Sequence, residues 1–121
     1  LTQERYVAAG HVVMRPQDSR GDTFQDWFVK QRLGLERRVA ATSYGFATVA
    51  ALLVGTPHVA TMHERLARQM ARLHPLTIKP CPLEIPPMAQ GMQWHQYRTQ
   101  DPGITWLCEK MRAAARRLGA G

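Results

Sequence analysis

The sequence predicts an α/β fold, on three observations. Segments of strand character alternate with segments of helical character along most of the 121 residues. Glycine and proline stand at the ends of several of these segments. Apolar residues make up 45% of the chain, which is enough for one hydrophobic core in a chain of single-domain length. Such alternation is typical of a largely parallel sheet joined by right-handed crossovers.

The first elements are a strand, a helix and a second strand. Residues 11–14 are a short apolar run that ends at Arg15-Pro16, which predicts a buried strand. From Asp22 the apolar residues fall at helical spacing, and Gly34 stands where a helix commonly ends. Residues 38–43 then predict a strand with Val39, Ala41 and Ser43 on one face.

The middle of the chain predicts a helix, a strand and another helix. Residues 46–54 are apolar nearly all round, so we expect a buried helix there, with Ser43 as its cap. Residues 58–61 predict a short strand. The next helix covers about 64–73, with Leu66, Met70 and Leu73 on one stripe and a Glu64–Arg68 pair one turn apart. His74-Pro75 ends that helix.

The last third predicts strand, hinge, strand and helix. Residues 76–79 alternate as a strand, and four prolines among residues 80–87 exclude a central strand and favour a hinge. Residues 88–95 alternate again, which predicts another strand. Asp101-Pro102 starts a helix that ends at Gly119. We expect this helix to bury one face, formed by Ile104, Leu107, Cys108, Met111, Ala115 and Leu118.

Composition places the protein in a broad class. The chain has 16 Lys and Arg against 9 Asp and Glu, which gives a net charge of +7. The basic residues are dispersed and are not interleaved with aromatic residues. This distribution favours solvated helix faces over a stacking surface for nucleic acid. The start of the chain lacks the pattern of a signal peptide, and no run of about 20 apolar residues exists. With two cysteines, the sequence predicts a soluble cytoplasmic protein in a reducing compartment.

Motifs for enzyme chemistry are missing from the sequence. It has no glycine-rich phosphate loop, no nucleophile elbow and no zinc motif, and its five histidines fall on five separate segments. Cys108 is expected to be buried and inert. We therefore predict a protein that is not an enzyme and that uses no metal or other cofactor.

A binding site has better support, at the turn after residues 38–43. Tyr44, Gly45 and Phe46 follow Ser43 directly, so hydroxyls, backbone N–H groups and aromatic rings meet where a strand enters a helix. A small anionic or aromatic ligand suits such a turn, and Thr61 after the next strand is a second lining residue. The alternative is a capping turn whose aromatic rings only cover the core, with Thr61 as a helix cap.

These residues resemble a known family. Residues 43–67, SYGFATVAALLVGTPHVATMHERLA, are similar to the effector-binding domain of LysR-type transcriptional regulators, especially members that sense aromatic compounds or plant signals, such as nodulation and naphthalene-degradation regulators. Further segments are similar to the same domain: HVVM at 11–14 with RGD at 20–22, PP at 86–87, MQWH at 92–95, DP at 101–102 and WL at 106–107. The chain departs from the family at His63 and Pro57, where members usually have Pro and Asp.

The resemblance implies a partial effector-binding domain of the periplasmic-binding-protein-like type 2 fold. Residues 15–85 would form subdomain II, and residues 1–14 and 88–121 would belong to subdomain I, with crossings near Met14-Arg15 and Pro86-Pro87. The DNA-binding winged helix-turn-helix would lie outside this chain.

The resemblance also implies a function and partners. The chain would sense a small-molecule effector, reach DNA through the missing N-terminal domain and assemble as a homodimer or homotetramer away from membranes. The matching effector positions are His11, Met14, Arg15, Ser43, Tyr44, Gly45, Phe46 and Thr61.

Two other functions fit parts of the sequence. A two-lobed solute-binding domain of a transport system shares the predicted architecture and would need a secretory signal. A small basic nucleic-acid-binding protein fits the net charge and predicts DNA affinity that falls linearly with salt on a logarithmic scale.

Overall fold

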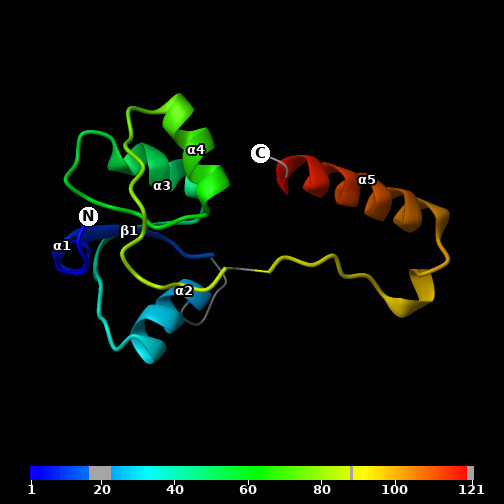
Figure 1. Ribbon diagram of the computed structural model, residues 1–121, viewed down its shortest axis with the longest axis horizontal. Coiled ribbons are helices and arrows are strands. Elements are labelled where there is room, and N and C mark those ends of the chain that lie inside the picture. The colour runs from blue at the N-terminus through cyan, green and yellow to red at the C-terminus, as the bar shows by residue number, and fades with distance from the viewer. Residues whose placement is uncertain (17–22, 88, 120–121) are drawn as a thin grey trace. The chain divides into compact units, whose positions relative to one another are not determined.

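The computed structural model describes residues 1–16, 23–87 and 89–119, and it leaves the side chains of Phe24 and Gln25 undescribed (Figure 1). The chain divides into two compact units, Leu1–Pro86 and Pro87–Gly121. Each unit is described by itself.

The first unit is built around two parallel strands, β1 (Gly10–Met14) and β2 (Arg38–Ser43). Their register pairs Gly10 with Arg38 and Met14 with Ser43, with an irregularity after His11. On its other edge β1 forms an isolated parallel bridge to Val59. Because β1 is paired on both sides, its residues 10–13 are buried, as the apolar run predicts.

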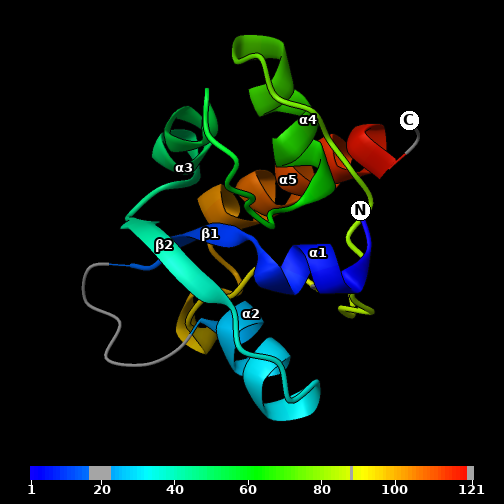
Figure 2. The same ribbon diagram turned by 90° about the vertical axis from the view of Figure 1, so that its left-hand side faces the viewer.

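Helices cover both faces of the strand pair. In Figures 1 and 2, α3 (Phe46–Leu53) and α4 (Glu64–Leu73) lie on one side, and α2 (Phe24–Trp27) lies on the other. The α2 helix continues as a π-helical turn, η1 (Phe28–Arg32), and α1 (Gln3–Ala8) precedes β1. The first unit thus combines helices with a two-stranded parallel sheet.

The hydrophobic core of the unit draws on segments far apart in the sequence. Tyr6, Val29 and Leu83 form its buried centre, and partly buried apolar side chains pack around it: Val7, Leu33, Leu35, Val59 and Ile85. Leu83 belongs to the proline-rich stretch, which therefore closes the core as extended chain. That role suits a segment whose prolines cannot donate to a sheet.

Several predicted elements are confirmed. The strands at 11–14 and 38–43 form, and the helix at 64–73 has the predicted bounds and ends at His74. Its Arg68 Nη2 lies 2.6 Å from Glu64 Oε1, which is the predicted one-turn ion pair. Asp22, where the first predicted helix was expected to start, lies outside the described residues.

Three strand predictions are wrong. Residues 76–79 and the described residues among 88–95 form no strand, and the strand at 58–61 is reduced to the single bridge at Val59. Alternation of apolar and polar residues specifies only which faces a strand would have. A strand also needs a neighbour to pair with, and the described residues offer these segments none.

The helix α3 is less buried than predicted. Val49 and Ala50 are buried, but Leu52 and Val54 are 42% and 40% exposed. An all-round apolar helix needs cover on every side, and α3 contacts the strands β1 and β2 while part of its apolar surface stays exposed. The prediction of a fully buried helix is therefore wrong for this chain.

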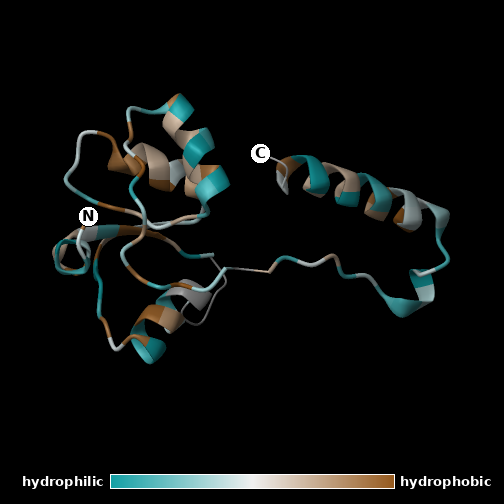
Figure 3. Ribbon diagram, viewed as in Figure 1, coloured by the Kyte–Doolittle hydropathy of each residue, from teal (hydrophilic) through white to brown (hydrophobic). Residues whose placement is uncertain are grey.

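The second unit contains a short 3-10 turn, η2 (Gln96–Arg98), and the long helix α5 (Pro102–Gly119). Asp101 Oδ1 accepts hydrogen bonds from the backbone N–H groups of Gly103 (2.8 Å) and Ile104 (3.2 Å), which confirms the predicted N-cap. These bonds, Ile104 first, lower the pKa of the Asp101 carboxyl group. Figure 3 shows hydrophobic and hydrophilic residues alternating along α5.

The predicted burial of the α5 apolar face is wrong for this chain. Cys108 is buried, but Leu107, Met111 and Leu118 are 47%, 48% and 59% exposed. The described part of the second unit has no sheet against which a helix face could pack.

The division at Pro86 and Pro87 falls at the predicted second crossing. The first predicted crossing, near Met14-Arg15, does not separate two units here, since residues 1–14 lie in the same unit as residues 15–85 and β1 pairs with β2. Which segments form each subdomain of a complete regulator stays a prediction, as does the periplasmic-binding-protein-like fold.

Among the described residues, none of the helices combines the length and the apolar character required to cross a membrane.

Candidate functional site

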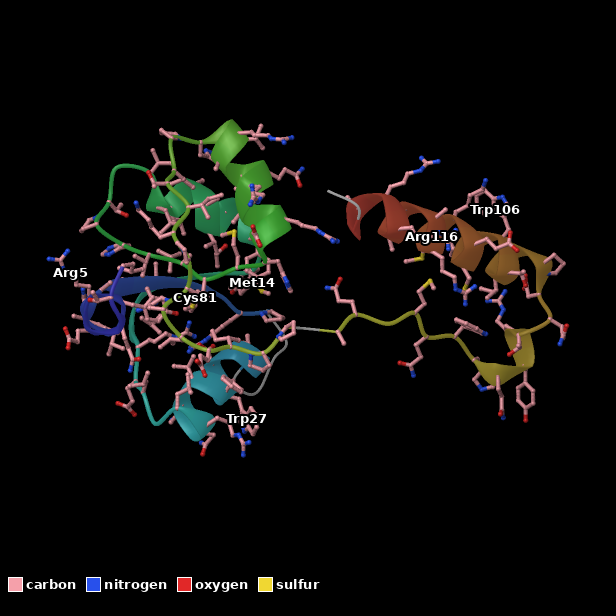
Figure 4. All side chains as sticks on the ribbon, in the orientation of Figure 1. Arg5, Met14, Trp27, Cys81, Trp106 and Arg116 are labelled. Atoms are coloured by element: carbon pink, nitrogen blue, oxygen red, sulfur yellow. The ribbon has the colours of Figure 1, made fainter. Side chains whose placement is uncertain are left out.

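The predicted turn residues lie at the carboxyl ends of both strands. Met14 is the last residue of β1 and pairs with Ser43, the last residue of β2. The Arg15 backbone N–H donates to the Ser43 carbonyl oxygen at 2.9 Å, which holds the two strand ends together. Figure 4 labels Met14 at this edge of the first unit. These three residues therefore lie close together, and their role in binding an effector stays a prediction.

The turn into α3 is closed by Ser43 without capping the helix. Ser43 Oγ lies 3.4 Å from both the N–H nitrogen and the carbonyl oxygen of Gly45. Gly45 is the N-cap residue of α3, in extended conformation, and no side chain caps the helix there. Ser43 is therefore not the predicted cap, because its hydroxyl reaches only the turn between strand and helix.

The aromatic rings of this turn differ in exposure. Tyr44 is 72% exposed, whereas Phe46, the first residue of α3, is partly buried. We call Met14, Arg15 and residues 43–46 the strand-end turn. It combines a hydroxyl, a guanidinium, an exposed phenol ring and the N-terminus of a helix whose first N–H groups receive no side-chain cap.

The two remaining predicted residues, His11 and Thr61, gather around Tyr6. The Tyr6 hydroxyl lies 2.6 Å from Thr61 Oγ1, and the His11 ring packs edge-on against the Tyr6 ring with centroids 4.7 Å apart. His11 Nε2 lies 2.8 Å from the Tyr6 carbonyl oxygen. Since a carbonyl only accepts, the Nε2 nitrogen carries the proton.

His11 is completely buried, which disfavours its charged form. Burial lowers the pKa of His11 below its ordinary value, and Arg37 and Arg38 act in the same direction, against the hydrogen bond to Tyr6. Its Nδ1 nitrogen has no hydrogen-bond partner among the described residues. His11 thus stands in the structure as a buried residue of β1 whose neutral form is favoured.

A chain of polar contacts connects the Tyr6 cluster with Arg15. Arg37 Nη1 donates to the Tyr6 hydroxyl at 3.4 Å, and the other Arg37 nitrogen, Nη2, forms an ion pair with Asp26 Oδ1. Asp26 Oδ2 lies 3.5 Å from Arg15 Nε. The contacts thus run from Thr61 through Tyr6, Arg37 and Asp26 to Arg15. They connect the predicted residues around Tyr6 with those of the strand-end turn.

Sequence reasoning missed Tyr6, Asp26 and Arg37. Asp26 carried a signal, because Thr23 and Asp26 have the spacing of a capping box, and Thr23 Oγ1 both donates to Asp26 Oδ2 (3.0 Å) and accepts from the Asp26 N–H (3.2 Å). Tyr6 and Arg37 carried none, since their pairing depends on how residues 31 positions apart meet in the fold.

Over the part of the chain that the structure describes, no three His, Cys, Asp or Glu residues gather in a way that could hold a metal ion. Cys81, labelled in Figure 4, is exposed on the segment that follows α4. Cys108 is buried on α5.

The chain is similar to nodulation proteins along almost its whole length. Nodulation protein D 2 of Rhizobium tropici is 37% identical over 109 residues, which are 90% of this chain and 34% of that protein. Nodulation protein D 1 of Rhizobium tropici is 32% identical over 118 residues, 98% of this chain and 38% of that protein. Nodulation protein D 1 of Bradyrhizobium diazoefficiens is 31% identical over all 121 residues, 38% of its own length.

The chain therefore spans about a third of the length of the curated relatives it matches. No protein-family model matches it.

Proposed function

We propose that this chain is the ligand-sensing part of a bacterial transcriptional regulator of the LysR type, and is not an enzyme. The observation that carries the proposal is the similarity to nodulation protein D over 90–100% of the chain. The residues of the family resemblance are the same ones that form the strand-end turn in the structure. In the intact cytoplasmic regulator, DNA would be read by a region outside this chain.

The effector in this proposal binds at the strand-end turn and is small and aromatic or anionic. Arg15 is the cation for a negative charge, and the Ser43 hydroxyl and the free N–H groups at the start of α3 are hydrogen-bond donors. Tyr44 and Phe46 are the faces on which an aromatic ring would stack. Thr61, held against Tyr6, is the member of the predicted set that lines the site from the next segment.

Binding there would act by population shift. A ligand that contacts one arrangement of two subdomains better than another favours that arrangement in proportion to its differential affinity. In a homodimeric or homotetrameric regulator, the change would alter how the DNA-binding regions are presented.

The first alternative is a basic nucleic-acid-binding protein, and a titration of the isolated chain with duplex DNA distinguishes it from the proposed regulator. The isolated chain should bind duplex DNA weakly, without sequence preference, and with an affinity that falls linearly with salt on a logarithmic scale. The intact regulator should protect a defined operator in the same footprinting assay. A sharp footprint of one operator by the isolated chain would contradict the proposed division of labour.

A solute-binding domain of a transport system is the second alternative. The upstream coding sequence distinguishes this alternative from the proposed regulator. A solute-binding domain needs a secretory signal there, whereas the regulator needs a helix-turn-helix.

A further inference from the structure

A partly open hollow of about 250 Å³ lies in the first unit, and residues 43–46 are not among the residues that line it. Val29 and Lys30 of the π-helical turn η1 form one wall, and the segment 35–37 with Val39 forms the other. Arg15 and Asp26 complete its lining. We call this the arginine hollow, and it shares Arg15 with the strand-end turn.

The arginine hollow has an excess of positive charge. Three cations line it, Arg15, Lys30 and Arg37, against the two carboxylates of Asp26 and Glu36. The Arg37 side chain is 4% exposed and is paired with Asp26, so its charge is already compensated. The excess of one charge therefore falls on the more exposed side of the hollow, where a monovalent anion would balance it.

One hydrogen-bond donor at the hollow is buried without an acceptor. Arg15 Nε is 3.5 Å from Asp26 Oδ2, within ion-pair range, but it forms no hydrogen bond with any described residue. Asp26 Oδ2 already accepts from Thr23 Oγ1 at 3.0 Å. A buried donor without a hydrogen bond is uncommon, and it leaves the charge of the Arg15 guanidinium only partly compensated by Asp26.

The remaining lining is apolar and offers room for an organic group. Val29, Leu35 and Val39 contribute it, and Val39 is 39% exposed. A cavity of about 150 Å³ is known to hold a benzene molecule, so this larger hollow has space for a ring and a charged group.

The wall formed by η1 supports a binding role. A π-helical turn is less favourable than an α-helical one and is found frequently at functional sites. Here it includes residues 28–32, and it carries the buried Val29 next to the exposed Lys30 at the edge of the hollow.

We infer that the arginine hollow binds a small carboxylate with an apolar body, as a second ligand site that shares Arg15 with the strand-end turn but does not include residues 43–46. The carboxylate accepts from Arg15 and Lys30, and the apolar body contacts Leu35 and Val39. The inference goes beyond the proposed function, because it rests on the lining of this hollow and not on the resemblance to regulators.

The probe for this site is 3-phenylpropionate, and 3-phenylpropanamide is its uncharged match. Both are titrated into the full ¹⁵N-labelled chain, and the amide signals are followed by NMR. The acid should shift the amides of residues 29–39 with a dissociation constant at least tenfold lower than that of the amide, because it alone offers a charged acceptor.

One variant tests the lining, and two variants outside it serve as controls. Arg15→Gln should weaken binding of the acid about ten- to hundredfold, and it should fold because the Arg15 side chain is 42% exposed. Arg65→Gln removes an exposed arginine of α4 outside the hollow and should leave binding unchanged. Ser43→Ala should also leave it unchanged, which separates this site from the proposed effector site.

Three results would overturn the inference. Equal affinity for acid and amide would remove the role of charge. Unchanged binding in Arg15→Gln would remove the role of the hollow. Shifts confined to residues 43–47 would place the ligand at the strand-end turn instead.

Discussion

At the scale of single residues, burial decides what a polar side chain does in this protein. His11 and Arg15 were predicted as neighbours in one effector site, on the basis of the same family resemblance. The structure places His11 completely inside the core with its pKa lowered, while Arg15 is partly exposed at the strand end. The sequence predicts which strand carries each residue, but which face is covered depends on residues such as Tyr6 that arrive from another segment.

The lowered pKa of His11 has a consequence for stability. Unfolded histidine titrates near its ordinary pKa of about 6.5, so below that pH the unfolded state binds more protons than the folded state. The free energy of unfolding of the first unit should therefore be highest above that pH and should decrease as the pH falls through about 6.5. Denaturation measured between pH 5 and pH 8 checks this.

A matched pair of variants isolates the contribution of His11. His11→Gln retains an N–H donor for the Tyr6 carbonyl and should flatten the decrease in stability at low pH. His63→Gln, at an exposed position before α4, should show the same decrease in stability at low pH as the unmodified chain. A slope that is the same in both variants would show that His11 is not the group responsible.

At the scale of elements, local signals predicted more than periodicity did. The N-cap Asp101, the one-turn pair Glu64–Arg68 and the end of α4 at His74 were all predictable, because each involves residues within four positions of each other. The strands at 76–79 and 88–95 were not, since alternation alone supplies no pairing partner. The contacts of Tyr6 with Thr61 and Arg37 were equally out of reach, being separated by 55 and 31 positions.

The cap of α5 gives a prediction at this scale. Asp101→Ala removes the acceptor of two backbone N–H groups and should lower the helical signal in circular dichroism, whereas Asp101→Asn should retain it, because Asn caps as well as Asp. In the native chain the carboxylate is the better acceptor, so capping should weaken as the pH falls through the lowered pKa of Asp101. Equal helicity in both variants would contradict the capping role.

At the scale of the whole molecule, the chain divides at Pro86 and Pro87 into a unit with its own core and a unit dominated by one helix. The apolar face of α5 includes Leu107, Met111 and Leu118, each about half exposed. At about 25 cal/mol per Å² of apolar surface, leaving such a face in water forgoes several kcal/mol, which is comparable to the stability of a small domain.

We therefore expect the isolated chain to associate with a second copy through this face. Sedimentation should show a mass that increases with concentration, and the double variant Leu107→Glu/Met111→Glu should remain monomeric. Thr105→Glu adds the same kind of charge on the polar side of α5 and is the control. A wild-type chain that stays monomeric at high concentration with a fully formed α5 would contradict this expectation.

The proposed effector site at the strand-end turn is tested most directly by the effector dose-response of the intact regulator that carries this chain. Ser43→Ala and Phe46→Ala should raise the half-maximal effector concentration about ten- to hundredfold, the equivalent of about 1.5–3 kcal/mol for a lost hydrogen bond to a charged group in the case of Ser43. Operator affinity without effector should not change, and Thr48→Ala, at an exposed position on α3, should respond as the wild type does. An unchanged dose-response in both turn variants would contradict the site, and with it the proposal that this chain senses a ligand there.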